Sequence, residues 1–532
     1  MSGIVHKYDL VLDTLPLTLV RDEGDRPMWQ RESIPLEEGQ QTSSSDRPHP
    51  FVTCHFGGGY ARFNVQGCYD EALNVDCSIP GVVILGPKQT DLTISGSANV
   101  SDFFEIGGKL YVLAGRYCKR LDPSDDSVKT PNNGADGKDF GAGAVATKAV
   151  LFEGNAYIGF SSDTPIEEFS GSAWDNVDPD TSSATVVRAK YWGREYMDEV
   201  GDRLWAAYSS VYVRGCATGD DPLKADDWSP ATPHSIGDSG HAITGMVSAD
   251  NRIYVAKTNG LYDFDSASRF ANILKHVEQF TSSTNGVNTI TDGRHIYYPH
   301  ETGLIEYSRE SRGARSVQPY GASGSTSRYG RITAQTILGK WHYVALYDGT
   351  DTWIMKGRYP DDDESMPQGW MGPMIWHDVT KLASVQCDAL KVCGLTTPAR
   401  LYYGRGANAG YIKIAKTSNP LVELSGQAFA ATGSLYLSPI NFMSPGSIDD
   451  LVGFDIENEG FTASNYVNVY VSFDGGSCPD GGSGRVSGER DELDEPSGGG
   501  ASASDVFVGG LDYVVAAEAD DSIAHEMFSL EG

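Results

Sequence analysis

Short segments that alternate hydrophobic and polar residues recur along the middle of this chain, and each follows a turn. The first lies at residues 106–112, where two glycines precede Leu110 and Tyr111, and similar segments follow turns near residues 154, 201, 250, 292 and 339. Successive turns are 42 to 49 residues apart. A period in the forties built from hairpins, without helical spacing, is typical of β-propeller blades. The pattern therefore predicts an all-β fold with a β-propeller.

The number of blades follows from the repeats and from the strands within them. A second strand often follows the first, as at residues 260–264, 303–307 and 352–356, and a more divergent unit lies at residues 398–414. We therefore expect seven blades over residues 91–418. The glycine turn at residues 56–63 is nearly in phase with the repeat. It predicts either a strand that closes the ring or a further blade.

The two ends of the chain differ from the repeats. Residues 1–90 combine lead-in strands with a polar stretch at residues 37–45, which is typical of an extended arm. Residues 419–532 contain period-two segments near residues 433–438, 451–456 and 465–473, and these predict a C-terminal β-sandwich. Within it, residues 475–505 are rich in glycine, serine and acidic residues, and we expect a long disordered-like loop there.

One repeat carries an insertion at residues 359–370. Insertions in propellers form loops on one face, where partners commonly bind. The insertion has an acidic run and a tryptophan, and a second tryptophan follows shortly after it. We therefore expect a partner-contact loop formed by Asp361, Asp362, Asp363, Glu364, Trp370 and Trp376.

The charge balance argues against nucleic acid as a partner. The chain has 41 basic and 72 acidic residues and a formal net charge of −31, whereas nucleic-acid binders concentrate lysine and arginine. High solubility explains the charge, and adaptation to high salt is the alternative. We expect no membrane insertion because no apolar run is long enough to span a bilayer. The N-terminal residues do not resemble a secretion signal, so we expect synthesis in the cytoplasm of a host cell.

Short motifs give little support for catalysis. Residues 236–240 contain the Gly-Asp-Ser-Gly string of serine proteases, but no partner motif for a catalytic histidine is apparent, and these are common turn residues. Residues 55–59 and the half Asp-boxes at residues 348–353 and 474–476 likewise predict turns. Acidic clusters at residues 122–126, 178–180 and 361–364 predict solvated loops, with incidental calcium as the alternative. We expect no catalytic, cofactor-binding or metal-binding residues.

The eight cysteines form no Cys-x-x-Cys pair, so a zinc ribbon or a thioredoxin-like site is unsupported. We expect most of them to be buried thiols. Cys54, Cys68 and Cys77 are close enough in sequence to pair, although an intracellular origin disfavours disulfides.

Several stretches together resemble a group of virion proteins. The lead-in residues 56–60, 68–70, 74–76 and 80–87 are similar to the segment that precedes the propeller in tail proteins of tailed bacteriophages and related viruses. The propeller follows directly, and residues 433–442 resemble the opening of the β-sandwich after it. The resemblance implies a minor tail, baseplate or tail-fibre protein located in the virion tail, and it carries over no site residues.

The expected function is therefore structural rather than enzymatic. We expect a virion tail component that acts in assembly and host attachment, with other virion tail proteins as partners and a symmetric multi-copy assembly. Two alternatives remain at this point. One is an adhesion module that binds host cell-surface glycan, and the other is a glycan hydrolase built on a propeller.

Overall fold

The computed structural model describes residues 10–12, 15–21, 27–31, 68–79, 82–161, 164–176, 191–197, 201–207, 211–224, 227–249, 252–264, 270–274, 281–301, 303–317, 319, 330–361, 373–415, 426–437, 466–473, 483–486 and 524–531. No α-helix occurs in these ranges. The chain divides into two compact units, Met1–His49 and Pro50–Gly532. In the first unit, an antiparallel sheet has the order β1 (Leu10–Leu12), β2 (Leu15–Arg21), β3 (Pro27–Arg31).

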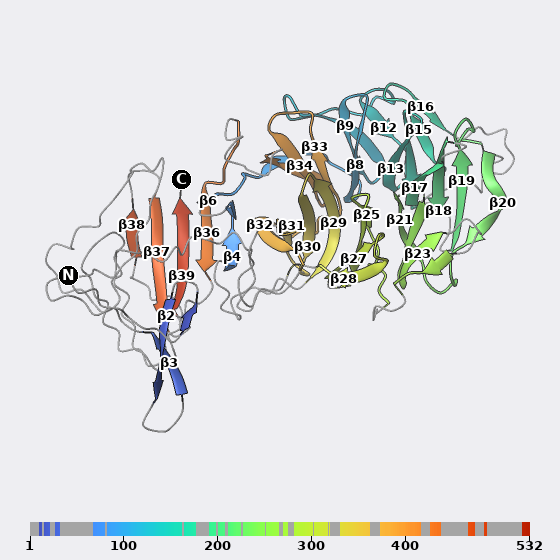
Figure 1. The fold of residues 1–532 in the computed structure, drawn as a ribbon. Coiled ribbons are helices and arrows are strands. Elements are labelled where there is room, and N and C mark those ends of the chain that lie inside the picture. Colours follow the sequence, from blue (N-terminus) through green and yellow to red (C-terminus); the bar gives the residue numbers. More distant parts are fainter. Residues whose placement is uncertain are drawn as a thin grey trace. The chain divides into compact units, whose positions relative to one another are not determined.

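The second unit contains seven antiparallel sheets of four or five strands, which are the blades of a β-propeller (Figure 1). Blade 1 consists of β8 (Val100–Ile106), β9 (Lys109–Ala114), β10 (Tyr117–Asp122), β11 (Ser127–Val128) and β12 (Gly137–Asp139). Blade 2 consists of β13 (Ala146–Phe152), β14 (Asn155–Phe160), β15 (Glu167–Phe169) and β16 (Trp174–Asn176). Blade 3 consists of β17 (Tyr191–Met197), β18 (Gly201–Ala207), β19 (Tyr212–Ala217) and β20 (Trp228–Ser235).

The next three blades keep the same four-stranded order. Blade 4 consists of β21 (Ile243–Ala249), β22 (Arg252–Lys257), β23 (Gly260–Phe264) and β24 (Phe270–Asn272). Blade 5 consists of β25 (Ile290–Thr291), β26 (His295–His300), β27 (Gly303–Ser308) and β28 (Gly313–Ser316). Blade 6 consists of β29 (Arg331–Leu338), β30 (Trp341–Tyr347), β31 (Thr352–Arg358) and β32 (Ile375–Leu382).

The last blade closes the ring with a strand from the opposite end of the propeller sequence. Blade 7 has the order β33 (Leu390–Cys393), β34 (Ala399–Arg405), β35 (Asn408–Ile414), β7 (Thr90–Leu92). The predicted seven-bladed propeller is thus confirmed, and its closing strand comes from the lead-in at residues 90–92. The turn at residues 56–63, which we considered for this role, lies outside the described residues.

The repeated turns of the sequence join the first two strands of the blades. Gly154 and Gly339 have φ angles of +85° and +57°, and a β-carbon at either position would meet no atom within 4 Å. Glycine is therefore favoured there by backbone conformation rather than by crowding. Because the turn sets the register, the residues after it alternate between the two faces of the blade.

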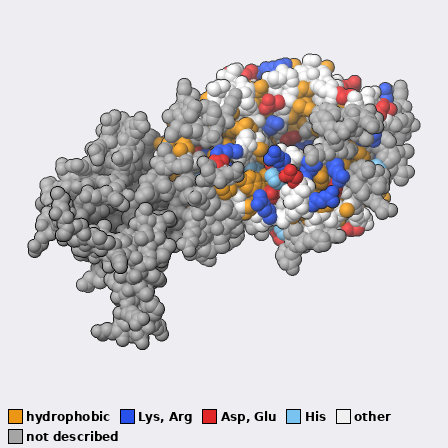
Figure 2. All heavy atoms as spheres, viewed as in Figure 1, with side chains coloured by type: hydrophobic (Ala, Val, Ile, Leu, Met, Phe, Trp, Pro, Cys, Tyr) orange, Lys and Arg blue, Asp and Glu red, His pale blue; other side chains and the backbone are white. Residues whose placement is uncertain are grey.

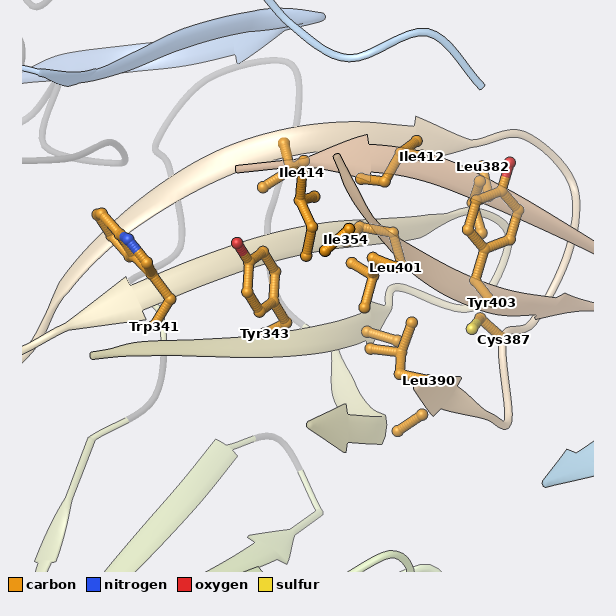
Figure 3. Close-up of a cluster of buried hydrophobic side chains, with 14 residues drawn as sticks. Trp341, Tyr343, Ile354, Leu382, Cys387, Leu390, Leu401, Tyr403, Ile412 and Ile414 are labelled. Atoms are coloured by element: carbon orange, nitrogen blue, oxygen red, sulfur yellow. The ribbon is translucent and has the colours of Figure 1, made fainter. Parts of the chain in front are cut away.

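Among the described residues, the hydrophobic core of the propeller consists of seven clusters, one at each interface between neighbouring blades. Figure 3 shows the cluster between blades 6 and 7, where Tyr343 and Ile354 approach Leu401 and Ile412. Burial of one such large side chain contributes roughly 1.5–3 kcal/mol. Each blade therefore depends on both neighbours for its stability.

Outside the propeller, strands of the C-terminal region form a sheet with one strand of the lead-in, and we call it the C-terminal sheet. Its order is β38 (Ser483–Val486), β37 (Tyr466–Phe473), β39 (Ala524–Glu531), β36 (Thr432–Leu437), β4 (Tyr69–Leu73). The second layer of the predicted sandwich is not among the described residues, so the sandwich stays a prediction beyond this sheet. β38 lies within residues 475–505, so that predicted loop contains a strand.

Residues 69–92, which we call the strap, join these parts. After β4, the strap forms the hairpin β5 (Val75–Ile79) and β6 (Val82–Leu85), and it then ends in β7. The Ala72 N–H donates to Asp378 Oδ2 of β32 at 3.1 Å, and the Asp378 N–H donates to the Tyr69 hydroxyl at 3.0 Å. The strap is therefore bonded to the C-terminal sheet, blade 6 and blade 7.

Candidate functional site

The recurrent aromatic of each repeat has a fixed neighbour in the fold. It lies on the second strand of its blade, in the core facing the next blade, and it is paired in register with a residue of the third strand. That partner is charged in five of the seven blades. The pairs are Tyr111–Arg120, Tyr157–Glu168, Trp205–Gly215, Tyr254–Asp263, Tyr297–Glu306, Tyr343–Lys356 and Tyr402–Tyr411.

Two of these charged residues lie at the two interfaces of blade 6, which also carries the insertion. Glu306 of blade 5 lies at the interface with blade 6, and Lys356 of blade 6 lies on the side that faces blade 7. Glu306 belongs to a polar group between blades 5 and 6 that we call the seam cluster. Its members are Asp292, His295, Tyr297, Glu306, Arg315 and Tyr359. The seam cluster is the first part of the candidate site, and the surroundings of Lys356 are the second.

In the seam cluster, the Glu306 carboxylate lies beside the guanidinium group of Arg315 and the imidazole ring of His295. Its side chain is only 2% exposed, and Arg315 Nη2 lies 3.1 Å from Oε1. His295 Nε2 lies 3.7 Å from the same oxygen. Burial raises the pKa of Glu306, and the charges of Arg315 and His295 offset this only in part. The carboxylate is therefore enclosed by protein groups.

The Asp292 carboxylate is likewise directed into the seam. Its Oδ2 lies 3.0 Å from His295 Nδ1 and accepts a hydrogen bond from the Tyr297 hydroxyl at 3.1 Å. Burial opposes ionisation, but the bonds from His295 and from the Arg294 N–H outweigh it and lower the pKa of Asp292. The Tyr359 ring of blade 6 completes the cluster, with the Arg315 guanidinium carbon 5.3 Å from its centre.

A buried histidine continues this polar group towards the inner strand of blade 6. The His342 ring packs against Tyr297 in a tilted arrangement, with ring centres 4.4 Å apart, and its Nε2 lies 2.9 Å from Gln335 Oε1. Burial lowers the pKa of His342 to about 3. The imidazole is therefore neutral at physiological pH, which suits a packing role better than proton transfer.

The predicted contact loop begins at the seam cluster, but only part of it is described. Asp361 is exposed and pairs with Lys340 at 3.1 Å and with Arg358 at 3.8 Å. Trp376 is only 3% exposed, and its indole N–H donates to the Val317 carbonyl at 2.8 Å. Its ring therefore packs between blades 5 and 6 and is not a surface platform. The remaining expected residues, Asp362, Asp363, Glu364 and Trp370, lie outside the described residues.

The second part of the site is a pocket beside Lys356, between blades 6 and 7 and the strap. Lys356 Nζ lies 2.6 Å from Asp76 Oδ2, donates to the Ser78 hydroxyl at 2.9 Å and lies 4.9 Å from the centre of the Trp341 ring. Burial opposes ionisation of Asp76, but the Lys356 ammonium and the bonds from Ser78 dominate and lower its pKa to about 2. The lysine and the aspartate thus satisfy each other.

The size and lining of this pocket favour a structural role. Its cavity volume is about 50 Å³, and Ile84, Pro87, Val379 and Ile414 supply apolar walls. Small-molecule sites usually have volumes of roughly 300–1,000 Å³. The pocket has room for a few water molecules only.

The acidic cluster at residues 122–126 forms turns and an interblade contact. Asp122 and Asp125 accept backbone hydrogen bonds from Ser124 and Ser127, at 3.1 and 2.9 Å. Asp126 binds Arg400 and the Tyr411 hydroxyl of blade 7. Within the described residues, no group of three or more histidine, cysteine, aspartate or glutamate side chains is arranged to hold a metal ion.

The protease-like string also has a structural explanation. It lies between β20 and β21, where Asp238 Oδ1 accepts the Gly240 N–H at 2.8 Å and contacts His241 Nδ1 at 2.7 Å. The Asp238 carbonyl accepts a hydrogen bond from the buried Lys257 ammonium at 2.7 Å. The predicted turn is confirmed here, as is the turn at Asp348, which accepts the N–H groups of Thr350 and Asp351.

Six cysteines fall in the described part of the chain, and all are buried, as expected. They are Cys68, Cys77, Cys118, Cys216, Cys387 and Cys393. Burial raises the pKa of the Cys387 thiol to about 12 and that of the Cys393 thiol to about 11. These two thiols therefore stay protonated and are poor nucleophiles at neutral pH.

Sequence reasoning missed the seam cluster and the Asp76–Lys356 pair. The repeat itself contained a signal, because aligning the hairpins places Glu306 and Lys356 at one position of the repeat. Their partners could not be inferred, since Asp76 is 280 residues from Lys356. The two residues meet because the fold places β5 of the strap beside β31 of blade 6.

Figure 2 shows Lys and Arg side chains gathered on the visible face of the propeller, with Asp and Glu among them. No helix in the described part of the chain is long and apolar enough to cross a membrane. Fold and site together define a seven-bladed β-propeller protein with polar, internally paired seams on both sides of blade 6.

No protein-family model matches the sequence, and no curated protein matches it. Among solved structures, the chain is similar to the extracellular domain of BT4673 from B. thetaiotaomicron, with a TM-score of 0.41 and 13% identity over 62% of this chain and 40% of that chain. A second structure of that domain gives a TM-score of 0.39 and 12% identity over 62% and 40%. PorZ, a surface component of the type-IX secretion system of Porphyromonas gingivalis, gives 0.38 and 12% over 71% and 42%.

The chain thus spans about two fifths of the length of the structures it matches. Our assignment of seven blades rests on the strand pairing described above rather than on these similarities.

Proposed function

We propose that this protein is a structural component of a virion tail, as a minor tail, baseplate or tail-fibre protein. Its propeller acts as a rigid platform in assembly and host attachment. The strap is the observation that carries the proposal. This one segment adds β4 to the C-terminal sheet, pairs Asp76 with Lys356 of blade 6 and completes blade 7 with β7. Such a continuous connection suits a part that transmits load between neighbours.

The chemistry of the seams supports a structural rather than an enzymatic role. Glu306, Lys356 and Arg400 are buried and paired with other side chains of the protein, so the loss of one partner would leave a buried charge without compensation. The pocket beside Lys356 is too small for a sugar residue together with catalytic groups. The order of lead-in, propeller and C-terminal sheet also agrees with the resemblance to phage tail proteins.

The test is to locate the protein on particles. Antibodies against the purified propeller, coupled to gold, should label the tails of virus particles produced by cells that carry the gene. Cryo-electron microscopy of the same particles should show a seven-bladed ring in several copies. Propeller antibodies that label host cells but never particles would overturn the proposal.

A glycan array probed with the full-length protein separates the adhesion role from the purely structural one. Binding to host glycan without particle labelling would favour the adhesion module. Release of sugar from surface polysaccharide by the purified protein would instead favour the hydrolase.

A further inference from the structure

Four arginines gather at one end of blade 5, and we call them the arginine rim. Arg294 lies in the turn before β26. Arg309 and Arg312 lie in the turn between β27 and β28, and Arg315 lies in β28. The two turns are joined by a hydrogen bond from the Arg309 N–H to the Arg294 carbonyl at 3.2 Å. The fold therefore brings together cations that are separate in the sequence.

Two of these arginines are anchored so that their orientation is fixed. Arg309 donates to the Gly293 carbonyl at 2.8 Å and to the Tyr254 hydroxyl at 3.2 Å. Arg315 is held by Glu306 and lies over the Tyr359 ring, and 53% of its side chain is exposed. Anchored guanidinium groups lose less side-chain entropy when they bind an anion.

The other two arginines are available for binding. Arg294 and Arg312 are exposed, and neither forms an ion pair with any residue that the structure describes. The nearby carboxylates of Asp292 and Glu306 are bonded within the seam cluster, and Asp292 and Glu310 are the exposed acidic residues of the same two turns, against four arginines. The outer surface of the rim is thus cationic on a strongly acidic protein.

The acidic counterpart lies in the same chain. Residues 419–532 contain twenty acidic and two basic residues, a net charge of −18 out of −31 for the whole protein. A cationic rim and a strongly anionic region on one polypeptide allow one copy to attract the next. A contact between two different surfaces is head-to-tail, and repeating it builds rings or stacks.

We propose that the arginine rim of one copy binds the acidic C-terminal region of a second copy. The inference rests on the proposed multi-copy structural role and identifies the surfaces through which the copies meet. Arg294 and Arg312 supply the free charges, while Arg309 and Arg315 hold the rim in place.

The first test is self-association of the full-length protein by sedimentation velocity. Association is expected at an ionic strength of about 0.02 M and is expected to be lost at about 0.5 M, because salt screens exposed charges. The double variant Arg294→Glu and Arg312→Glu should weaken association at least about tenfold. The control is the double variant Lys109→Glu and Lys224→Glu, which changes the net charge of the protein by the same amount but at blades 1 and 3. It should associate like the wild type.

The second test identifies the contact directly. Lys340, on the neighbouring blade, is 40% exposed, and residues 419–532 contain no lysine. A carbodiimide should therefore link Lys340 to carboxylates of residues 419–532, and mixing ¹⁵N-labelled with unlabelled protein distinguishes links between copies from links within one copy. Links between copies that disappear in the Arg294→Glu, Arg312→Glu variant would support the proposal.

Several outcomes would overturn it. These are a monomer at low salt, links confined to single copies, equal weakening by both double variants, or binding of an acidic polysaccharide at the rim by a protein that stays monomeric. A monomeric protein that still labels virus tails would refute this contact while leaving the virion role intact.

Discussion

At the scale of single residues, one position of the repeat serves different purposes in different blades. Glu306 of blade 5 is paired within its own blade, whereas Lys356 of blade 6 is paired with the strap. Both lie opposite an aromatic residue on the neighbouring strand. A charge at this position is thus stable only because a partner is close by, and the identity of the partner decides what the position does.

Removal of Lys356 should be costly because it leaves the Asp76 carboxylate buried without its cation. We expect Lys356→Met to lower the free energy of unfolding by about 3 kcal/mol, measured by urea denaturation. The double variant Asp76→Asn, Lys356→Met should lose clearly less than the two single variants added together. Additive losses would show that the two residues do not interact.

The same pair predicts a dependence of stability on pH. The pKa of Asp76 is about 2 in the folded protein, below its ordinary value of 3.8. Because the unfolded chain binds this proton more tightly, the stabilisation is present above about pH 4 and is lost as the pH falls towards 2. The stability difference between wild type and Asp76→Asn should therefore shrink in this range. A difference that stays constant down to pH 2 would contradict this prediction.

Trp376 should behave as a core residue. Since its ring is buried and its N–H is bonded to Val317, we expect Trp376→Ala to cost about 3–5 kcal/mol. Trp376→Phe should recover part of this loss. A variant that unfolds like the wild type in thermal denaturation but loses binding to a partner would restore the surface role that the sequence suggested.

At the scale of elements, the strap shows how a few strand residues join distant parts of the chain. Periodicity predicts the strands of the blades because each turn and its alternating residues are local. It does not reveal that β7 completes blade 7 or that β4 borders the C-terminal sheet. Both pairings join segments more than 300 residues apart, and very short strands leave almost no periodic signal.

The closing strand offers a matched pair of substitutions. Leu92 is 6% exposed, whereas the neighbouring Asp91 side chain is 64% exposed and pairs with Arg405. We expect Leu92→Asp to destabilise the protein by roughly 3 kcal/mol, because it places a charge in the interblade core. Asp91→Ala should cost less than about 1 kcal/mol. Similar losses for both variants in urea denaturation would show that β7 does not close the ring.

At the scale of the whole molecule, the ring depends on the interface where the last blade meets the first. There Arg400 of β34 binds Asp126 of blade 1, and its guanidinium carbon lies 4.1 Å from the centre of the Tyr411 ring. The Tyr411 hydroxyl donates to the same aspartate at 2.8 Å. This contact reinforces the closure that β7 provides, since it links the two ends of the propeller sequence.

Two arginines of β34 test the importance of this interface. Arg400→Met should lower the free energy of unfolding by about 2 kcal/mol, because it removes the guanidinium group that forms a charge-assisted bond to Asp126 and a contact with the Tyr411 ring. Arg405→Met removes a half-exposed arginine from the same strand and should cost less than about 1 kcal/mol. Chemical denaturation monitored by tryptophan fluorescence measures both, and an equal effect would rule out a special role for the closing interface.

The sequence by itself determined the architecture of the propeller. Turn residues and alternating strands are local signals, and seven repetitions of them specify seven blades. It also predicted that most cysteines are buried and that turns occur at Asp238 and Asp348. These features depend on composition or on neighbours two or three residues away.

Only the tertiary structure decided which charges meet. Glu306 is paired with other strands of its own blade, Lys356 with the strap and Asp126 with blade 7. Trp376 is buried because it packs against blade 5. Such contacts depend on the packing of surfaces from distant parts of the chain, for which one sequence carries no local signal. The spacing of the repeated hairpins therefore specifies the propeller. The packing of neighbouring blades determines which polar residues meet between them.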